Sequence, residues 1–174
     1  MTTLLSIKLT GTKELEATLN RVVNFARRPR LAMREIAAVL EDETEKNFAS
    51  QGRPKKWQDL EGSTKEKRIG GKKGRKKDGS LRTRSVLILD HLKILQDSGK
   101  LASSVHSGHG DNYAVVGAAR PYAAIHQLGG KAGRSRGITI PARPYLPFAP
   151  DKKLQRGVDK KLLEVVRQHL QGAI

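Results

Sequence analysis

The sequence has no cysteine, few aromatic residues and no long hydrophobic run, and each absence excludes a class of protein. Without cysteine there is no disulfide framework and no thiol chemistry, which fits a reducing cytosol. Aromatic residues make up 4%, few for the stacking platform that binds single-stranded nucleic acid. The apolar runs are far too short to span a bilayer. The start, MTTLLSIKLTGTKELE, lacks the basic and apolar regions of a secretory signal, so we expect neither export nor a membrane partner.

What the sequence has in excess is positive charge. Its 34 Lys and Arg against 17 Asp and Glu give a formal net charge of +17, which favours nucleic acid or acidic protein as a partner. More than half of that charge lies in residues 52–84, where 13 basic and 4 acidic side chains give +9. The cations of this segment that we expect to face a partner are Lys72, Lys73, Arg75, Lys76 and Lys77.

The same segment, residues 52–84, has almost no aliphatic residues and no periodicity. It therefore cannot bury enough apolar surface to offset about 1–2 kcal/mol of backbone entropy for each ordered residue. We expect it to be a flexible basic loop, inserted in a single domain that spans residues 1–174, which becomes ordered when a partner binds. Trp57 within it fits two interpretations: an anchor for an interface or a base, or a side chain that covers the rim of its own domain.

Periodic patterns surround this insertion on both sides. Before it, alternation over residues 4–10 predicts a strand, and helical spacing predicts two long helices, roughly 12–28 and 30–49, joined at Pro29 as an antiparallel pair. In the second helix, Asp42, Glu43 and Glu45 are predicted to lie on the water-facing side.

After the insertion, residues 86–95 fit either a helix or a strand. The patterns that follow predict, in order, a β-hairpin over 101–118, a short helix over 121–128, a strand at 138–141 and a helix from about 151 to the C-terminus. The fold class is therefore α+β: a small, mostly antiparallel sheet packed by two long N-terminal helices and a C-terminal helix, with a long basic loop insertion.

Nothing in the sequence predicts catalysis, a metal site or a cofactor. The glycine-rich stretches GGKKGRKKDGS and GGKAGRSRG lack the spacing of a phosphate-binding loop. His106 and His109 lie three residues apart near Asp111, but we interpret them as polar residues of a solvent-facing turn. We expect a protein that is not an enzyme; a hydrolase that uses His106 or His126 is the least favoured alternative.

Three motifs occur in order over about 50 residues: LQDSGKLASSV, NYAVVGAARPYAAIHQLGG and ITIPARPYLPF. Together they resemble the phage virion morphogenesis family, the Mu-type tail-completion or head–tail joining proteins. The residues that carry the resemblance are Ser98, Gly99, Leu101, Ser104, Tyr122, Ala123, His126, Gln127, Gly129, Gly130, Ile140, Pro141, Ala142, Arg143, Pro144, Tyr145 and Leu146.

The resemblance implies a non-catalytic subunit of a ring, most often a hexamer, at the junction of capsid neck and tail. Its implied partners are copies of itself, neck or portal-side proteins, tail-tube proteins and double-stranded DNA in the lumen, with no small-molecule substrate. Its implied location is the virion, and the host cytoplasm during assembly. The alternative, taken from charge alone, is an accessory protein that binds nucleic acid through residues 52–84.

The chemistry of the third motif agrees with a rigid scaffold. Pro141 and Pro144 fix φ and remove backbone donors, so this segment pairs only at a sheet edge. Gly129 and Gly130 permit the positive φ at which a short helix ends. We expect His126 and Gln127 to bond to nearby backbone, and Arg143 to bind a carboxylate within or between subunits. The residues predicted to form this scaffold or a subunit interface are His126, Gln127, Gly129, Gly130, Arg143, Pro144 and Tyr145.

Overall fold

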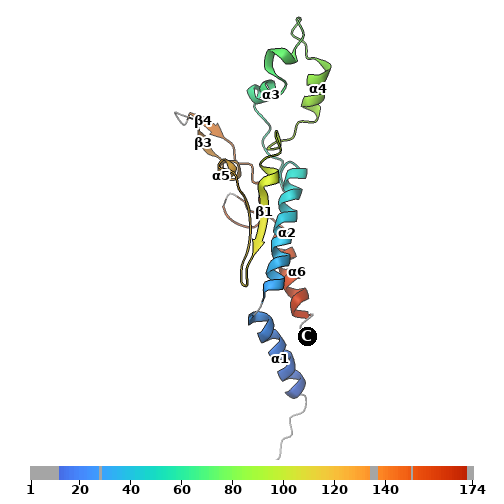
Figure 1. Ribbon diagram of the computed structural model, residues 1–174, viewed down its shortest axis with the longest axis vertical. Helices are drawn as coiled ribbons and strands as arrows, with labels where there is room; N and C mark the ends of the chain where they lie inside the picture. The colour runs from blue at the N-terminus through green and yellow to red at the C-terminus, as the bar shows by residue number, and fades with distance from the viewer. Residues whose placement is uncertain (1–11, 28, 134–136, 150, 172–174) are drawn as a thin grey trace, which may run out of the picture.

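The computed structural model describes residues 12–27, 29–133, 137–149 and 151–171, and shows an elongated molecule with a central body and an extension at each end (Figure 1). Within these residues the elements are α1 (Thr12–Arg27), α2 (Arg30–Ala49), α3 (Gly62–Arg68), the 3-10 helix η1 (Gly71–Gly74), α4 (Thr83–Asp90), the 3-10 helix η2 (Ala102–Ser104), β1 (Val105–His109), β2 (Ala114–Ala118), α5 (Ala123–Leu128), β3 (Gly130–Ala132), β4 (Ile138–Ile140) and α6 (Val158–Gln171). The predicted α+β class is confirmed. The strand predicted at residues 4–10 lies outside the described residues.

The body is built around α2, with a β-hairpin along one side and α6 along another (Figure 1). Strands β1 and β2 pair antiparallel, with Val105 opposite Ala118 and His109 opposite Ala114, which confirms the predicted hairpin. Strands β3 and β4 form a second antiparallel pair. The sheet is therefore divided into two small ribbons, and the longer one depends on α2 for its packing because isolated two-stranded ribbons are marginally stable.

Helices α1 and α2 do not form the antiparallel pair that we predicted. They lie end to end, so that α1 extends beyond the body (Figure 1). Pro29, the N-cap residue before α2, has φ −78° and ψ 12°, so the backbone leaves the helical conformation at this residue. The junction therefore bends the chain without reversing it. The end of α1 contacts α6, where the rings of Phe25 and His169 stack at 6.1 Å.

The hydrophobic core joins residues that are far apart in the sequence. Its buried members are Phe48, Trp57, Leu101, Ala123 and Tyr145. The ring of Phe48 lies 5.8 Å from that of Trp57 and 5.4 Å from that of Tyr145, between centroids. Trp57 also donates from Nε1 to the carbonyl oxygen of Pro144 at 3.1 Å. Trp57 is thus a core residue, so neither interpretation offered for it is correct.

Helix α6 begins seven residues later than predicted. In the preceding stretch, Phe148 forms an isolated bridge with Leu154, and Lys152 and Gly157 have positive φ values of 67° and 89°. A left-handed residue cannot continue a right-handed helix. The helix therefore starts only at Val158, immediately after Gly157.

The basic segment contains secondary structure, and the prediction of an irregular loop is wrong on that point. Residues 62–90, which we call the basic lobe, hold α3, η1 and α4 and protrude at the end of the molecule opposite α1 (Figure 1). An isolated bridge between Arg75 and Leu81 closes the turn between η1 and α4. Helix α4 also settles the ambiguity at residues 86–95, which are helical as far as Asp90. The mobility of the lobe stays a prediction.

Candidate functional site

Gln127 on α5 connects the short helix to residues 141–148, which we call the proline-rich segment. Its Oε1 accepts hydrogen bonds from the backbone N–H groups of Tyr145 (2.9 Å) and Leu146 (3.0 Å). Its Nε2 donates to the carbonyl oxygen of Phe148 at 2.8 Å. Gln127 is buried, so these bonds satisfy backbone groups that water does not reach. Gln127 bonds to backbone as expected, but its partners lie in residues 145–148 and not at the glycine turn that follows α5.

A second polar side chain, Asn47 on α2, holds the same segment from the other side. It is fully buried, and its Nδ2 donates to the carbonyl oxygen of Tyr145 at 3.0 Å and to Oε1 of Gln155 at 3.0 Å. Its Oδ1 accepts from Nε of Arg53 at 2.9 Å. Arg53 in turn donates to the backbone oxygen and the carboxylate of Glu43, each at 2.8 Å. A continuous polar network therefore links α2 to the proline-rich segment.

Glu43 is buried and ion-paired, which corrects its predicted place on the water-facing side of the helix. Burial alone would raise its pKa, but hydrogen bonds from Lys161, Arg53 and Lys46 outweigh burial and lower the pKa to about 2. The sequence carries a signal for this position. Leu40, Glu43 and Asn47 continue the apolar stripe of the helix at spacings of three and four, so they lie on its buried face.

Arg143 is buried, and among the described residues of this chain it binds backbone and not a carboxylate; a carboxylate on a neighbouring subunit stays a prediction. Its guanidinium donates from Nε to the carbonyl oxygen of Gln58 at 3.0 Å and from Nη2 to that of Asp59 at 3.1 Å. Gly129 ends α5 with φ +74°, and a Cβ there would lie 2.8 Å from the backbone nitrogen of Ala142. These contacts lie within one chain and make the proline-rich segment a scaffold. A role in subunit contacts for the same residues stays a prediction.

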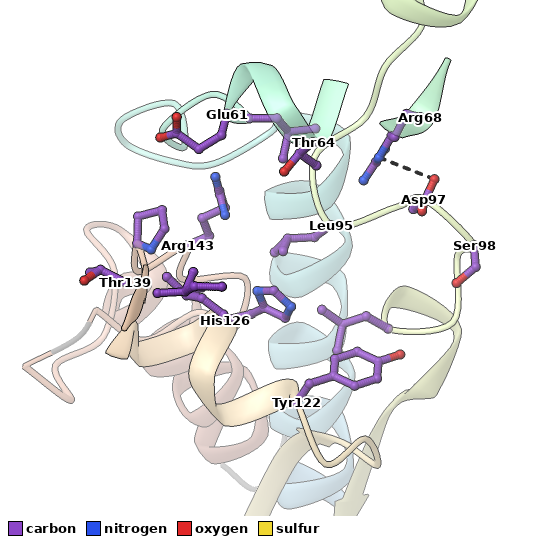
Figure 2. A pocket seen from close by; sticks show the side chains of 15 residues that line it. Glu61, Thr64, Arg68, Leu95, Asp97, Ser98, Tyr122, His126, Thr139 and Arg143 are labelled. Carbon is purple, nitrogen blue, oxygen red and sulfur yellow. Dashed lines mark ion pairs between the residues drawn. The ribbon is translucent and has the colours of Figure 1, made fainter. Parts of the chain in front are cut away.

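A cavity of about 540 Å³ lies between the basic lobe and the body, bounded by α3, the loop at 95–101, α5 and β4. Figure 2 shows the His126 ring in this cavity, with Leu95 on one side and Tyr122 on the other. Its Nδ1 is buried and has no hydrogen-bond partner among the described residues, so the expected bond from this side chain to backbone is not found. Burial, and then the charge of Arg143, lower the pKa of His126, which favours the neutral ring.

The predicted partner-facing cations do not all have the same surroundings. Arg75 pairs with Glu66 through two hydrogen bonds, Nε to Oε1 at 2.9 Å and Nη2 to Oε2 at 2.8 Å. The other four side chains are exposed, and no ion pair reaches them from any described residue. These four are Lys72, Lys73, Lys76 and Lys77. Arg75 thus serves the lobe itself, and the four lysines face solvent.

Neither a metal site nor a membrane span is found among the described residues. No group of three or more His, Asp or Glu side chains there is arranged to hold a metal ion. His106 and His109 are the second and the last residue of β1, and not part of a turn as predicted. No described helix is both long and apolar enough to cross a bilayer.

Comparison with known proteins gives consistent matches. A model described as the phage virion morphogenesis family matches residues 10–171. Mu-like prophage FluMu G protein 2 of Haemophilus influenzae is 32% identical over 147 residues, 84% of this chain and 86% of that protein. FluMu G protein 1 of the same bacterium is 32% identical over 142 residues, 78% of this chain and 80% of that protein. Protein G of Escherichia phage Mu, whose name provisionally assigns it to capsid assembly, is 33% identical over 82 residues, 47% of this chain and 49% of that protein. No solved structure matches the chain.

Proposed function

The chain belongs to the phage virion morphogenesis family, and on that premise we propose that it is a ring-forming subunit at the junction of neck and tail. Membership itself means a structural role in virion assembly, association with the virion and contact with other virion proteins. The proposal adds three points: the subunits close into a ring, most simply a hexamer, the ring joins head to tail, and its neighbours are neck or portal-side and tail-tube proteins. None of these roles is catalytic.

The observation that carries the proposal is the apolar stripe on α1. Leu15, Leu19 and Val23 are spaced four residues apart on one side of the helix and are 60%, 55% and 44% exposed. A 16-residue helix that extends from the body is marginal in water unless its apolar side is packed against something. The stripe therefore fits a contact that forms only on assembly.

The body of the same chain also has exposed apolar side chains. Helices α2 and α6 pack side by side, and each leaves a leucine exposed: Leu31 by 59% and Leu163 by 67%. When two different surfaces of one chain are complementary, the contact repeats head to tail and closes into a ring if the rotation between subunits allows it. We propose that α1 of one subunit packs on the α2–α6 surface of the next.

The ring is tested by the mass of the purified chain in solution. We expect sedimentation velocity to show an oligomer, six chains if the ring is a hexamer, and the triple variant Leu15→Ser, Leu19→Ser, Val23→Ser to remain a monomer. The matched control is Glu16→Ser, Asn20→Ser, Asn24→Ser, the same spacing on an exposed polar side of the same helix, which should assemble normally. A wild-type chain that stays monomeric at every concentration would exclude the ring.

The position in the particle is tested by deleting the gene and imaging the products. We expect electron micrographs to show DNA-filled heads and separate tails, and labelled wild-type protein to lie at the neck of complete particles. Empty heads would instead favour the alternative, an accessory protein that acts on nucleic acid. Complete particles without the protein would contradict both.

A further inference from the structure

In the basic lobe two acidic side chains, Glu66 and Asp78, have partners within the lobe, while four lysines have none. Glu66 is paired with Arg75, and the Asp78 carboxylate accepts from the backbone N–H of Ser80 at 2.9 Å and from its hydroxyl at 2.6 Å. Lys72, Lys73, Lys76 and Lys77 are exposed and have no acidic partner among the described residues. Like charges this close repel one another unless an anion lies against them. The lobe therefore presents a surface on which cations outnumber carboxylates.

Hydrogen bonds hold the backbone under these lysines. Gly74 is buried, and its carbonyl oxygen accepts from the Ser85 hydroxyl at 2.7 Å and from the N–H of Arg82 at 3.0 Å. A Cβ on Gly74 would lie 2.4 Å from the carbonyl oxygen of Ile69, so only glycine fits there. The N–H of Lys76 donates to the carbonyl oxygen of Ser80 at 2.8 Å. The lysines thus extend from a defined turn.

We infer that this turn binds the phosphate backbone of double-stranded DNA. Ammonium groups act as point charges on phosphate oxygens and give attachment without sequence specificity. The lobe, residues 62–90, contains no aromatic residue, so it has no platform for stacking the bases of a single strand. The lobe and α1 lie at opposite ends of the molecule, so bound DNA leaves the stripe on α1 free (Figure 1). DNA binding by the lobe does not depend on ring formation.

The test is binding of a fluorescent 30-base-pair duplex to the full chain over 50 to 200 mM NaCl. Neutralising one phosphate contributes about 0.9 to the slope of log K against log salt. Four contacts therefore weaken binding about a hundredfold over this range. In the variant Lys72→Gln, Lys73→Gln, Lys76→Gln, Lys77→Gln we expect the slope of log K against log salt to be smaller than in the wild type by about 3 to 4. We also expect this variant to lose most of its affinity for the duplex. Circular dichroism should show that the variant keeps the wild-type helix content.

The matched control removes the same charge elsewhere: Lys100→Gln, Lys131→Gln, Lys152→Gln, Lys160→Gln, all exposed in the wild type. We expect its salt slope to stay close to that of the wild type. An equal loss in both variants would overturn the inference, because binding would then reflect total charge and not the lobe. No duplex binding by the wild type at 50 mM NaCl would overturn it as well.

An acidic protein is the competing partner for this surface. Helix α4 exposes Val86 by 41% and Leu87 by 54%, and a protein partner would bury such side chains while a phosphate backbone would not. We therefore expect the variant Val86→Ser, Leu87→Ser to bind duplex DNA as the wild type does. Loss of DNA binding in that variant, with its fold intact, would contradict phosphate contact as the mode of binding.

Discussion

At the scale of single residues, buried polar side chains determine how the proline-rich segment is held. Glu43, Asn47 and Gln127 are each buried, and each is fully engaged in hydrogen bonds or ion pairs. Breaking one partner of such a network leaves the others unsatisfied in a place that water does not reach. The scaffold should therefore be more sensitive to changes at these polar residues than to changes at many apolar ones.

Replacing Glu43 should change both stability and its dependence on pH. The pKa of Glu43 falls from an ordinary 4.5 to about 2 in the folded chain, because its three cationic partners outweigh the cost of burial. A lowered pKa stabilises the fold above the unfolded-state value of 4.5, and this stabilisation is lost as pH falls through about 2. Glu43→Gln should lose about 3 kcal/mol at pH 7, and its deficit should disappear between pH 4.5 and pH 2. Urea unfolding at a series of pH values measures this.

The control for that series is Glu45→Gln, which changes an exposed carboxylate two residues away on the same helix. Its unfolding curves should follow those of the wild type at every pH. Parallel pH dependence for the wild type and Glu43→Gln would show that Glu43 is not the ionised group described above.

Replacing Gln127 by leucine should destabilise the fold, although the two side chains have similar volumes. Leucine removes both acceptor bonds to the N–H groups of Tyr145 and Leu146 and the donor bond to Phe148. We expect a loss of about 2–4 kcal/mol, since backbone groups left unsatisfied in the interior cost about 1–3 kcal/mol each. The control Gln168→Leu makes the same change at an exposed helical position and should be nearly neutral. Equal unfolding midpoints in urea would contradict the role assigned to Gln127.

At the scale of elements, sequence periodicity and turn residues predicted the helices and the hairpin that are determined by interactions between residues close together in the chain. The hairpin of β1 and β2, helix α5 with its terminal glycines, and both long helices follow from periodicity and turn residues close together in the sequence. The direction of α1 relative to α2 depends on φ and ψ at Pro29, which residue type alone does not specify. Lys161, which pairs with Glu43, and the backbone carbonyls that Arg143 binds are distant in the sequence, so no local pattern revealed those partners.

The helices of the basic lobe were not predicted from its amino-acid composition. The segment was predicted to lack structure because it has few aliphatic residues, yet hydrogen bonds to Gly74, one buried isoleucine and the Glu66–Arg75 pair connect its parts. Polar contacts of this kind leave no hydrophobic periodicity in the sequence. The low content of aliphatic residues correctly indicated a small hydrophobic core. It could not indicate the hydrogen bonds and the ion pair that connect the parts of the lobe.

The Glu66–Arg75 pair should govern local opening of the lobe. Arg75 also donates from Nη1 to the carbonyl oxygen of Gly79 at 3.0 Å, so it connects α3 to the turn before α4. We expect Arg75→Gln to speed amide hydrogen exchange in residues 70–82 while the midpoint of global unfolding stays nearly unchanged. Arg84→Gln removes an exposed charge from the same lobe and should leave exchange at the wild-type rate. Unchanged exchange in Arg75→Gln would mean that the pair contributes nothing to local order.

At the scale of the whole molecule, the two extensions carry opposite chemistry. Helix α1 presents an apolar stripe at one end, and the basic lobe presents lysines at the other, with the polar network and the aromatic core between them (Figure 1). The network fixes the proline-rich segment against α2. Both extensions are therefore attached to one rigid body, and the two proposed contacts can form at the same time.

This separation predicts opposite responses to salt. Copies with a net charge of +17 repel one another, and salt shortens the range of that repulsion from about 10 Å at 0.1 M to about 3 Å at 1 M. Apolar contact through α1 should therefore strengthen as NaCl rises from 0.1 to 1 M, while affinity for duplex DNA falls steeply. Sedimentation velocity measures the first, and anisotropy on the monomeric Leu15→Ser, Leu19→Ser, Val23→Ser variant measures the second without interference from assembly. If oligomer and DNA complex both dissociate with salt, charge holds the subunits together and the stripe on α1 does not.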